Sequence, residues 1–420
     1  MDRATKTRTK ITVSVERKIL AFYEGKSNGS RRCVVTGDTR QVDLHHLDET
    51  PSHSAEERNL LPLKHKLNVS LDSRQFRRLH SDLLPGVLAE KAGEHYANGK
   101  YTYAYGCSVL GASLAFLVPW KHRKPGPYYI DETTAAYFAA NALVSLRPLN
   151  RVDYACHVLN WLVLPILRRW GDRIERPVLA RLTMEIGSYF RDALFHREAL
   201  EWSSIARRAL RGEIASTHVR TLLARLHQHD AITHLTCDRH EKALESLRRA
   251  RDEITIAYSI GHANEDLYRE QVRLRSGQPD LEAVKNVVKG YLNRPNPSTT
   301  TKWTARELQL TLAQAQYQRG DKRGSDRAFA VIREFLRVLE RNPVVPTQAI
   351  FPRALRAFAD QYPSHRRQVE VLARVLPPEF LTLAAKAKMR LWDLVRRSPV
   401  RIMPPNRPLH PAALTVTGRG

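Results

Sequence analysis

The chain has 420 residues, 42% of them hydrophobic and 26% charged, so it is long enough for two or three globular domains and lacks a disordered or collagen-like composition. It carries 68 Lys and Arg against 43 Asp and Glu, a net charge of +25, which predicts a polyanionic partner such as nucleic acid. Its four cysteines lie far apart in the sequence, which excludes a disulfide framework and a four-cysteine zinc site.

No segment predicts export or membrane insertion. The first 18 residues are basic and polar, without the apolar core of a signal peptide. The most apolar segments, residues 107–120 and 157–167, are too short to span a bilayer and predict buried helices. We therefore expect a cytoplasmic protein with no membrane partner, because the sparse cysteines also favour a reducing compartment.

The N-terminal segment predicts a helix followed by a strand. Apolar residues recur at helical spacing over residues 13–25, and Gly25 ends the run. Residues 31–36 are rich in β-branched side chains and lead into the turn pair Gly37-Asp38, so we expect a first strand there.

The next segment predicts a second strand, a loop and a helix. Hydrophobic and polar residues alternate over residues 41–46, which is typical of a strand. A polar, proline-containing loop is expected over 47–58, then a short apolar run at 60–63. A helix is expected from His65 to about residue 79.

Four polar residues at fixed spacing lie within this segment. His45 and His46 are adjacent, Asn59 follows thirteen residues later, and Asn68 nine residues after that. Imidazole and amide groups of this kind can hold one divalent cation beside a general base. That is the minimum equipment for hydrolysing a phosphodiester.

The order of these residues resembles the HNH, or ββα-metal, nuclease family. The resemblance covers residues 13–80 and rests on a basic helix, Cys33-Val34-Val35-Thr36-Gly37, His45-His46, Asn59-Leu60-Leu61-Pro62-Leu63 and Asn68. It implies a metal-dependent endonuclease. DNA is the substrate of most such motifs, and RNA is the alternative.

The resemblance also implies a role for each polar residue. His46 would be the general base that takes a proton from the attacking water, and Asn59 would orient its ring. His45 and Asn68 would be the metal ligands, with His65 as the alternative to Asn68. Two protein ligands leave positions for water and phosphate, which suits Mg²⁺, with Mn²⁺ or another transition metal as the alternative.

Many members of the family also hold a structural zinc through two Cys-x-x-Cys pairs. The corresponding positions here are Cys33, Thr36, Lys64 and Leu67, and three of these cannot supply a thiolate. We therefore expect no structural zinc.

Charged residues surround the motif. The acidic loop residues 48, 49, 56 and 57 can either supply a further metal ligand or be solvated. Six basic residues could contact phosphates, with a solvated surface as the alternative for each: Arg31, Arg32, Arg40, Arg58, Lys64 and Lys66.

Beyond about residue 80 the sequence predicts an all-α region with tetratricopeptide-like (TPR-like) repeats. Small residues at repeat positions let two antiparallel helices approach closely, and the pairs then stack. The offsets are not a constant 34 residues, so the region is TPR-like rather than a regular array, and an irregular helical bundle is the alternative. The matching positions are Gly99, Tyr101, Ala104, Ile186, Gly187, Phe190, Ala199, Ala206, Ala243, Ala250, Tyr317 and Gly320.

The predicted fold is therefore mostly α, with a small α+β domain of the HNH type followed by an all-α TPR-like domain. We expect the HNH domain over residues 1–80 and the helical domain over 81–395, with a sub-boundary near the proline-containing segment 293–301. Residues 396–420 are basic and proline-rich, which predicts a disordered tail.

The predicted function is metal-dependent hydrolysis of DNA, with the helical region binding a protein partner, a regulator or the nucleic acid itself. Small nucleases fused to helical sensors are often found in bacterial antiviral defence, and we expect this role by analogy of architecture. The alternative is a non-catalytic TPR-like interaction protein whose HNH fold is a degenerate nucleic-acid-binding module.

Overall fold

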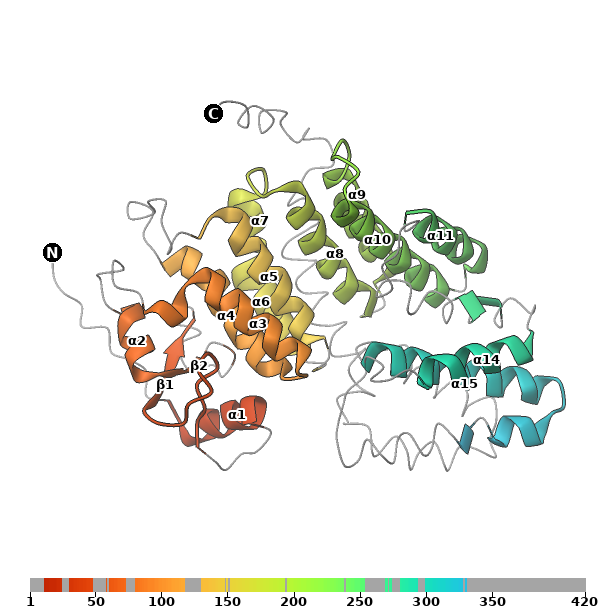
Figure 1. Cartoon of the computed structure of the whole chain (residues 1–420), viewed down its shortest axis with the longest axis horizontal. Helices are drawn as coiled ribbons and strands as arrows, with labels where there is room; N and C mark the ends of the chain where they lie inside the picture. Colours follow the sequence, from red (N-terminus) through yellow and green to blue (C-terminus); the bar gives the residue numbers. More distant parts are fainter. Residues whose placement is uncertain are drawn as a thin grey trace. The chain divides into compact units, whose positions relative to one another are not determined.

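The computed structural model is mostly helical, with one small two-stranded sheet among the residues that it describes (Figure 1). The described residues are 11–24, 30–47, 58, 60–72, 80–117, 130–147, 149, 152–192, 195–237, 239–253, 269–270, 272–273, 280–293, 299–327 and 329–330. The predicted disordered tail, residues 396–420, lies outside them. No described helix combines the length and the apolar character needed to cross a bilayer.

The chain divides into two compact units. Unit 1 comprises residues 1–146 and 153–178, and unit 2 comprises residues 147–152 and 179–420. The predicted domain boundaries near residues 80 and 395 remain predictions. Unit 1 contains α1 (Val13–Glu24), β1 (Val42–His46), β2 (Leu60–Lys64), α2 (His65–Asp72), the 3₁₀ helix η4 (Ser81–Leu83), α3 (Pro85–Ala97), α4 (Tyr101–Leu117), α5 (Glu132–Leu146), α6 (Val152–Val158) apart from its first residue, the π-helix η6 (Leu159–Val163) and α7 (Leu164–Trp170).

The sheet of unit 1 is an antiparallel pair that leads directly into a helix. Val42 pairs with Lys64 and His46 with Leu60. β2 is buried from its first residue to its fourth, and α2 begins at the residue after β2 ends. The order is therefore strand, strand, helix. The helix expected over 13–25, the strand expected over 41–46 and the start of the helix at His65 are confirmed.

The strand expected over residues 31–36 is wrong, because this segment forms a closed turn. Gly37 N donates to Cys33 O at 2.8 Å, and Cys33 N donates to Asp38 O at 2.8 Å. Gly37 adopts a φ of 73°, which favours glycine. Val34 N donates to Pro62 O at 3.1 Å, so the turn lies beside β2. The two strands of the sheet are therefore β1 and β2, without a strand over residues 31–36.

Helix α4 is the central support of unit 1. Its residues 104–115 are all buried, as the apolar segment from residue 107 predicts. A Cβ at Gly106 would lie 3.0 Å from Val34 Cβ and 3.1 Å from Leu61 Cδ1, so α4 packs closely against the turn and β2. Cys107 Sγ donates to Val34 O at 3.3 Å. The sheet is thereby attached to the helices of the same unit.

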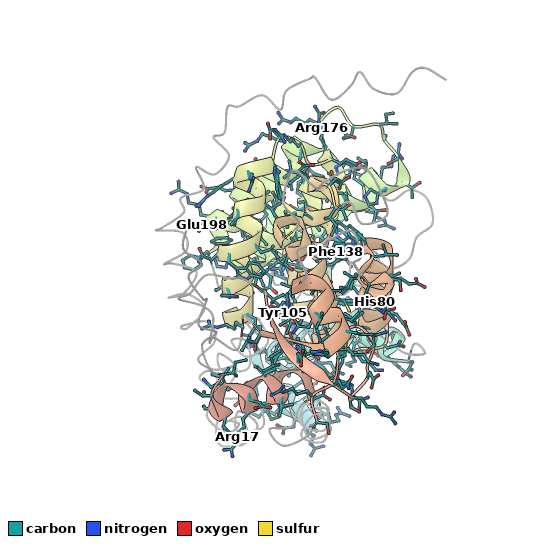
Figure 2. The ribbon with its side chains drawn as sticks, turned by 90° about the vertical axis from the view of Figure 1, so that its left-hand side faces the viewer. Arg17, His80, Tyr105, Phe138, Arg176 and Glu198 are labelled. Carbon is teal, nitrogen blue, oxygen red and sulfur yellow. The ribbon has the colours of Figure 1, made fainter. Side chains whose placement is uncertain are left out.

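Helix α1 packs on α4 and α6 through aromatic rings. The rings of Phe22 and Tyr154 stack with centroids 4.1 Å apart, and the Tyr105 ring meets Phe22 edge-on at 5.9 Å. Tyr103 Oη donates to Glu24 Oε1 at 2.6 Å. Figure 2 shows Tyr105 and Phe138 on the packed helices of this unit, with Arg17 on the exposed side of α1.

The turn between α3 and α4 has the geometry that its glycine predicts. Gly99 adopts a φ of 72°, and Lys100 N donates to His95 O at 2.8 Å, which ends α3 in the manner of a Schellman motif. The same pattern recurs after α15, where Gly320 has a φ of 84° and Asp321 N donates to Gln316 O at 2.9 Å.

Unit 2 is built from helices that pack in sequential pairs. At the predicted repeat positions, Ala199, Ala206, Ala243 and Ala250 are fully buried. A Cβ at Gly187 would lie 3.1 Å from Trp202 Cβ, so α8 and α9 approach closely there. The TPR-like arrangement itself remains a prediction. The helices are α8 (Arg176–Asp192), α9 (His196–Ala209), α10 (Thr217–Thr236), α11 (His240–Glu253), α14 (Leu281–Leu292) and α15 (Thr299–Gln318).

The close packing of α4 on α5 gives a testable prediction. A Cβ at Gly111 would lie 2.7 Å from the Phe138 ring, which is closer than a real contact allows. We expect Gly111→Ala to lower the free energy of unfolding by about 1–3 kcal/mol. Gly93 on α3 has open space, so Gly93→Ala should instead raise it by about 0.5–1 kcal/mol. Chemical denaturation measures both, and equal effects would contradict this packing.

Helix α10 predicts a pH dependence of unit 2. Burial lowers the pKa of His227, His229 and His234 below 6.5, so each imidazole binds a proton more weakly in the folded chain than in the unfolded chain. The contribution of these histidines to the free energy of unfolding is therefore complete above pH 6.5. It decreases as the pH drops below this value, by at most about 1.4 kcal/mol per pH unit for each histidine. We expect hydrogen exchange of α10 amides to quicken from pH 7 to pH 5 after correction for the intrinsic rate.

Two variants separate this effect from general acid destabilisation. His229→Gln should flatten the pH dependence, because its imidazole is buried and its Nδ1 lies 3.0 Å from Ser203 Oγ. His218→Gln, at an exposed position of the same helix, should leave the dependence as it is. An unchanged pH dependence in His229→Gln would refute the assignment.

Candidate functional site

The candidate site lies where β1 faces α2. Side chains alternate along a strand, so Asp43 and His45 lie on one face of β1. On α2, His65 and Asn68 are three residues apart and share one side of the helix. His65 N donates to Gln41 O at 2.6 Å, which holds the start of α2 beside the start of β1. The strand face and the helix side therefore meet.

The structure brings His45 and Asn68, the two predicted metal ligands, into contact. His45 Nδ1 and Asn68 Oδ1 form a hydrogen bond at 3.0 Å, and the two side chains are only 5% and 8% exposed. Asn68 Nδ2 donates to Asp43 Oδ2 at 3.2 Å. Because a carboxylate only accepts hydrogen bonds, this contact identifies the amide end that faces Asp43 and leaves Oδ1 facing His45.

The His45–Asn68 pair fits one divalent cation by its spacing. Ligands at adjacent corners of an octahedral Mg²⁺ site, each about 2.1 Å from the metal, are about 3 Å apart. Nδ1 and Oδ1, which are hydrogen-bonded to each other in this structure, are at that separation, so a cation bound by both would replace this hydrogen bond. Among the described residues, no group of three His, Cys, Asp or Glu side chains that could hold a metal ion is found.

His65, the alternative ligand, contacts Asp43 in the structure. Its Nδ1 lies 2.7 Å from Asp43 Oδ2, and its side chain is 59% exposed. Partial burial acts to raise the pKa of Asp43. The hydrogen bonds from His65 and Asn68 outweigh this effect and hold the pKa below its ordinary value. Asp43 is therefore a carboxylate at neutral pH.

The predicted base and its orienting residue are only partly placed. His46 is the last residue of β1 and pairs with Leu60, but its side chain lies outside the described part of the chain. Asn59 lies outside it too, as do the acidic loop residues 48, 49, 56 and 57. The roles of His46 and Asn59 remain predictions.

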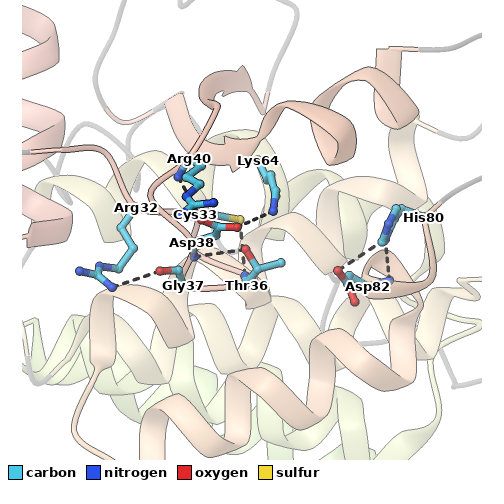
Figure 3. Close-up of polar contacts among 9 residues, drawn as sticks. All are labelled: Arg32, Cys33, Thr36, Gly37, Asp38, Arg40, Lys64, His80 and Asp82. Carbon is cyan, nitrogen blue, oxygen red and sulfur yellow. Dashed lines mark hydrogen bonds and ion pairs between the residues drawn. The ribbon is translucent and has the colours of Figure 1, made fainter.

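Arg31, Arg32 and Lys64, which belong to the six predicted phosphate-binding residues, contact other parts of the chain. Arg31 Nη2 lies 2.6 Å from Glu16 Oε1, and Arg32 Nη1 donates to Gly37 O at 3.1 Å. The Lys64 ammonium pairs with the Asp38 carboxylate (Figure 3). Arg58 is half-buried. The side chains of Arg40 and Lys66 are exposed and are the better placed to contact a ligand.

The turn at Cys33 is closed by hydrogen bonds of its own. Thr36 N donates to Cys33 Sγ at 3.4 Å, and Asp38 N donates to Thr36 Oγ1 at 3.3 Å. The hydrogen bond from Lys64, supported by one from Arg40 N, holds the pKa of Asp38 at about 2 (Figure 3). Leu67, the last of the four positions that correspond to structural zinc ligands in the family, is fully buried. The absence of a structural zinc stays a prediction.

Asp43 is the site residue that the sequence reasoning missed. Its signal was present, because the alternation over residues 41–46 places it on the same strand face as His45.

Comparison with protein-family models, with curated proteins and with solved structures finds no match to this chain.

The contacts of the basic residues predict two kinds of variant. Arg31→Ala should lower the free energy of unfolding by about 1 kcal/mol, because it removes a half-buried ion pair with Glu16 and a 3.3 Å bond to Val42 O. Arg40→Ala and Lys66→Ala should leave stability unchanged and each reduce the salt dependence of DNA binding by about one phosphate contact.

Fluorescence anisotropy with a labelled duplex at several salt concentrations measures the binding, and chemical denaturation measures the stability. A stable Arg31→Ala protein that loses as much affinity as the other two variants would contradict this division.

Proposed function

We propose that this chain is a metal-dependent endonuclease of the HNH type that hydrolyses DNA phosphodiester bonds. The observation that supports it most is the pair formed by His45 Nδ1 and Asn68 Oδ1, 3.0 Å apart, on a strand and a helix arranged as β-β-α. That spacing suits two adjacent ligands of one divalent cation. The residue after His45 in the same strand is His46, the proposed base.

The proposed roles divide among four residues. His45 and Asn68 hold the metal, with Mg²⁺ proposed first and Mn²⁺ or another transition metal as the alternative. When bound, the metal neutralises charge on the scissile phosphate and on the leaving oxygen. His46 accepts the proton of the attacking water, and Asn59 orients its imidazole.

The charge of the chain supports a polyanionic substrate. The net charge is +25, and the exposed Arg40 and Lys66 flank the start of α2, where the metal ligand Asn68 lies. Cations at these positions could contact the phosphates on either side of the scissile bond. DNA is the proposed substrate, and RNA is an outcome that the test below distinguishes.

The helical region is proposed to act as a partner-binding surface of the TPR type. The close approach of α8 and α9 at Gly187 and the buried alanines of α9 and α11 support paired helices that stack. A protein partner or regulator would bind there and control cutting, in a cytoplasmic antiviral role.

Cleavage of supercoiled plasmid DNA and of single-stranded RNA tests the proposal. We expect the full chain to cut DNA with Mg²⁺ or Mn²⁺ and to stop when EDTA removes the metal. His46→Ala should lower the rate by about 10²–10⁴-fold, the range typical for loss of a general base.

The matched control is His218→Ala, a histidine exposed on α10, which should cut as the wild type does. Equal cutting by the wild type and His46→Ala would refute the proposed base. A wild-type chain inert on DNA with both metals would refute the proposal, and binding of DNA without cutting would favour the degenerate binding module instead.

A further inference from the structure

We propose that Asp43 is a positioning residue that orients the amide of Asn68 so that its oxygen, and not its nitrogen, faces the metal position. This inference rests on the proposed function. It starts from a chain of hydrogen bonds in which Asp43 Oδ2 accepts from His65 Nδ1 at 2.7 Å and from Asn68 Nδ2 at 3.2 Å. The Oδ1 atom of Asn68 then lies 3.0 Å from His45 Nδ1.

An asparagine ligand needs such a partner because its amide has two chemically different ends. Only the oxygen can bind a cation, and the NH₂ group is a pure donor. A rotation of half a turn exchanges the two ends without changing the shape of the side chain. An amide ligand that nothing orients would therefore present its nitrogen to the metal for part of the time.

The carboxylate of Asp43 removes this ambiguity. It carries no hydrogen, so it attracts the NH₂ group of Asn68 and repels the oxygen. In the flipped orientation, two acceptor oxygens would face each other at the separation that Asn68 Nδ2 and Asp43 Oδ2 now have, 3.2 Å. A hydrogen bond to an ionised group is also stronger than a neutral one, which favours the observed orientation further.

His65 holds the carboxylate in place from the other side. Its Nδ1 donates to the same oxygen of Asp43, so rotation of the carboxylate would break two hydrogen bonds. The side chains of His65 and Asp43 are 59% and 37% exposed, while His45 and Asn68 are buried beneath them. Asp43 thus acts on the metal position through Asn68.

An exchange of the side chains at positions 43 and 68, made in two steps, tests the inference, because the double variant keeps the total charge. Asp43→Asn should weaken Mn²⁺ binding by the full chain about 10–100-fold, the usual effect of losing a group that orients a ligand. Adding Asn68→Asp should restore most of the lost affinity. In the double variant the NH₂ group of residue 43 would donate to a carboxylate at residue 68, whose two oxygens are equivalent, so no orientation is needed.

Mn²⁺ binding is measured by electron paramagnetic resonance, which does not depend on catalysis. The control is Asp38→Asn, which removes another carboxylate of the same unit, paired with Lys64 in the turn (Figure 3), and should leave Mn²⁺ affinity unchanged. Thermal unfolding of each variant shows that the fold is retained. If Asp43→Asn does not fold, Asp43→Ser, with a smaller side chain, takes its place.

The outcomes separate this inference from the proposed function. Wild-type affinity in Asp43→Asn would refute the positioning role, even if the wild-type chain cuts DNA. A double variant that binds Mn²⁺ no better than Asp43→Asn alone would also refute it. Weakened binding with restoration would support it, even if the wild-type chain cuts neither DNA nor RNA.

Discussion

The register of β1 against β2 determines the whole candidate site. Because α2 starts at the residue after β2 ends, the pairing of Val42 with Lys64 also fixes where Asn68 lies relative to His45. A slip of one residue would turn Asp43 and His45 to the opposite face of the strand. The hydrogen bond from His65 N to Gln41 O continues the pairing by one step beyond the strands and so holds α2 in this register.

The helices of unit 1 stabilise this register by burying β2. Leu60, Leu61 and Leu63 are at most 1% exposed, and Leu61 packs against α4 at Gly106. A two-stranded sheet alone is marginally stable in water, and packing against a helix is one of the ways to make it stable. The turn at Cys33 is also attached to α4, through the hydrogen bond from Cys107 to Val34, and α1 packs on α4 and α6 through its aromatic contacts.

Sequence reasoning predicted the elements whose signal is local. The spacing of apolar residues predicted α1, the alternation predicted β1, and the apolar run that begins at Cys107 predicted a buried helix, which is α4. The pairing of His45 with Asn68 followed from a resemblance. The segment 31–36 was misassigned because its β-branched residues Val34 and Val35 are buried by packing, while the turn signal at Gly37-Asp38 closes back onto Cys33 and not onto a following strand. The partners of Arg31 and Lys64 were missed because Glu16 and Asp38 are 15 and 26 residues away.

Gly106 makes the burial of the sheet depend on helix α4. Without a side chain there, α4 approaches the turn at Val34 and the strand at Leu61 closely enough that both are fully buried. A β-β-α unit grafted onto an unrelated helical scaffold would expose these two residues unless the graft included α4. The β1-β2-α2 segment therefore depends on α4 for its burial, and a transfer of this segment to another protein would have to include the helix.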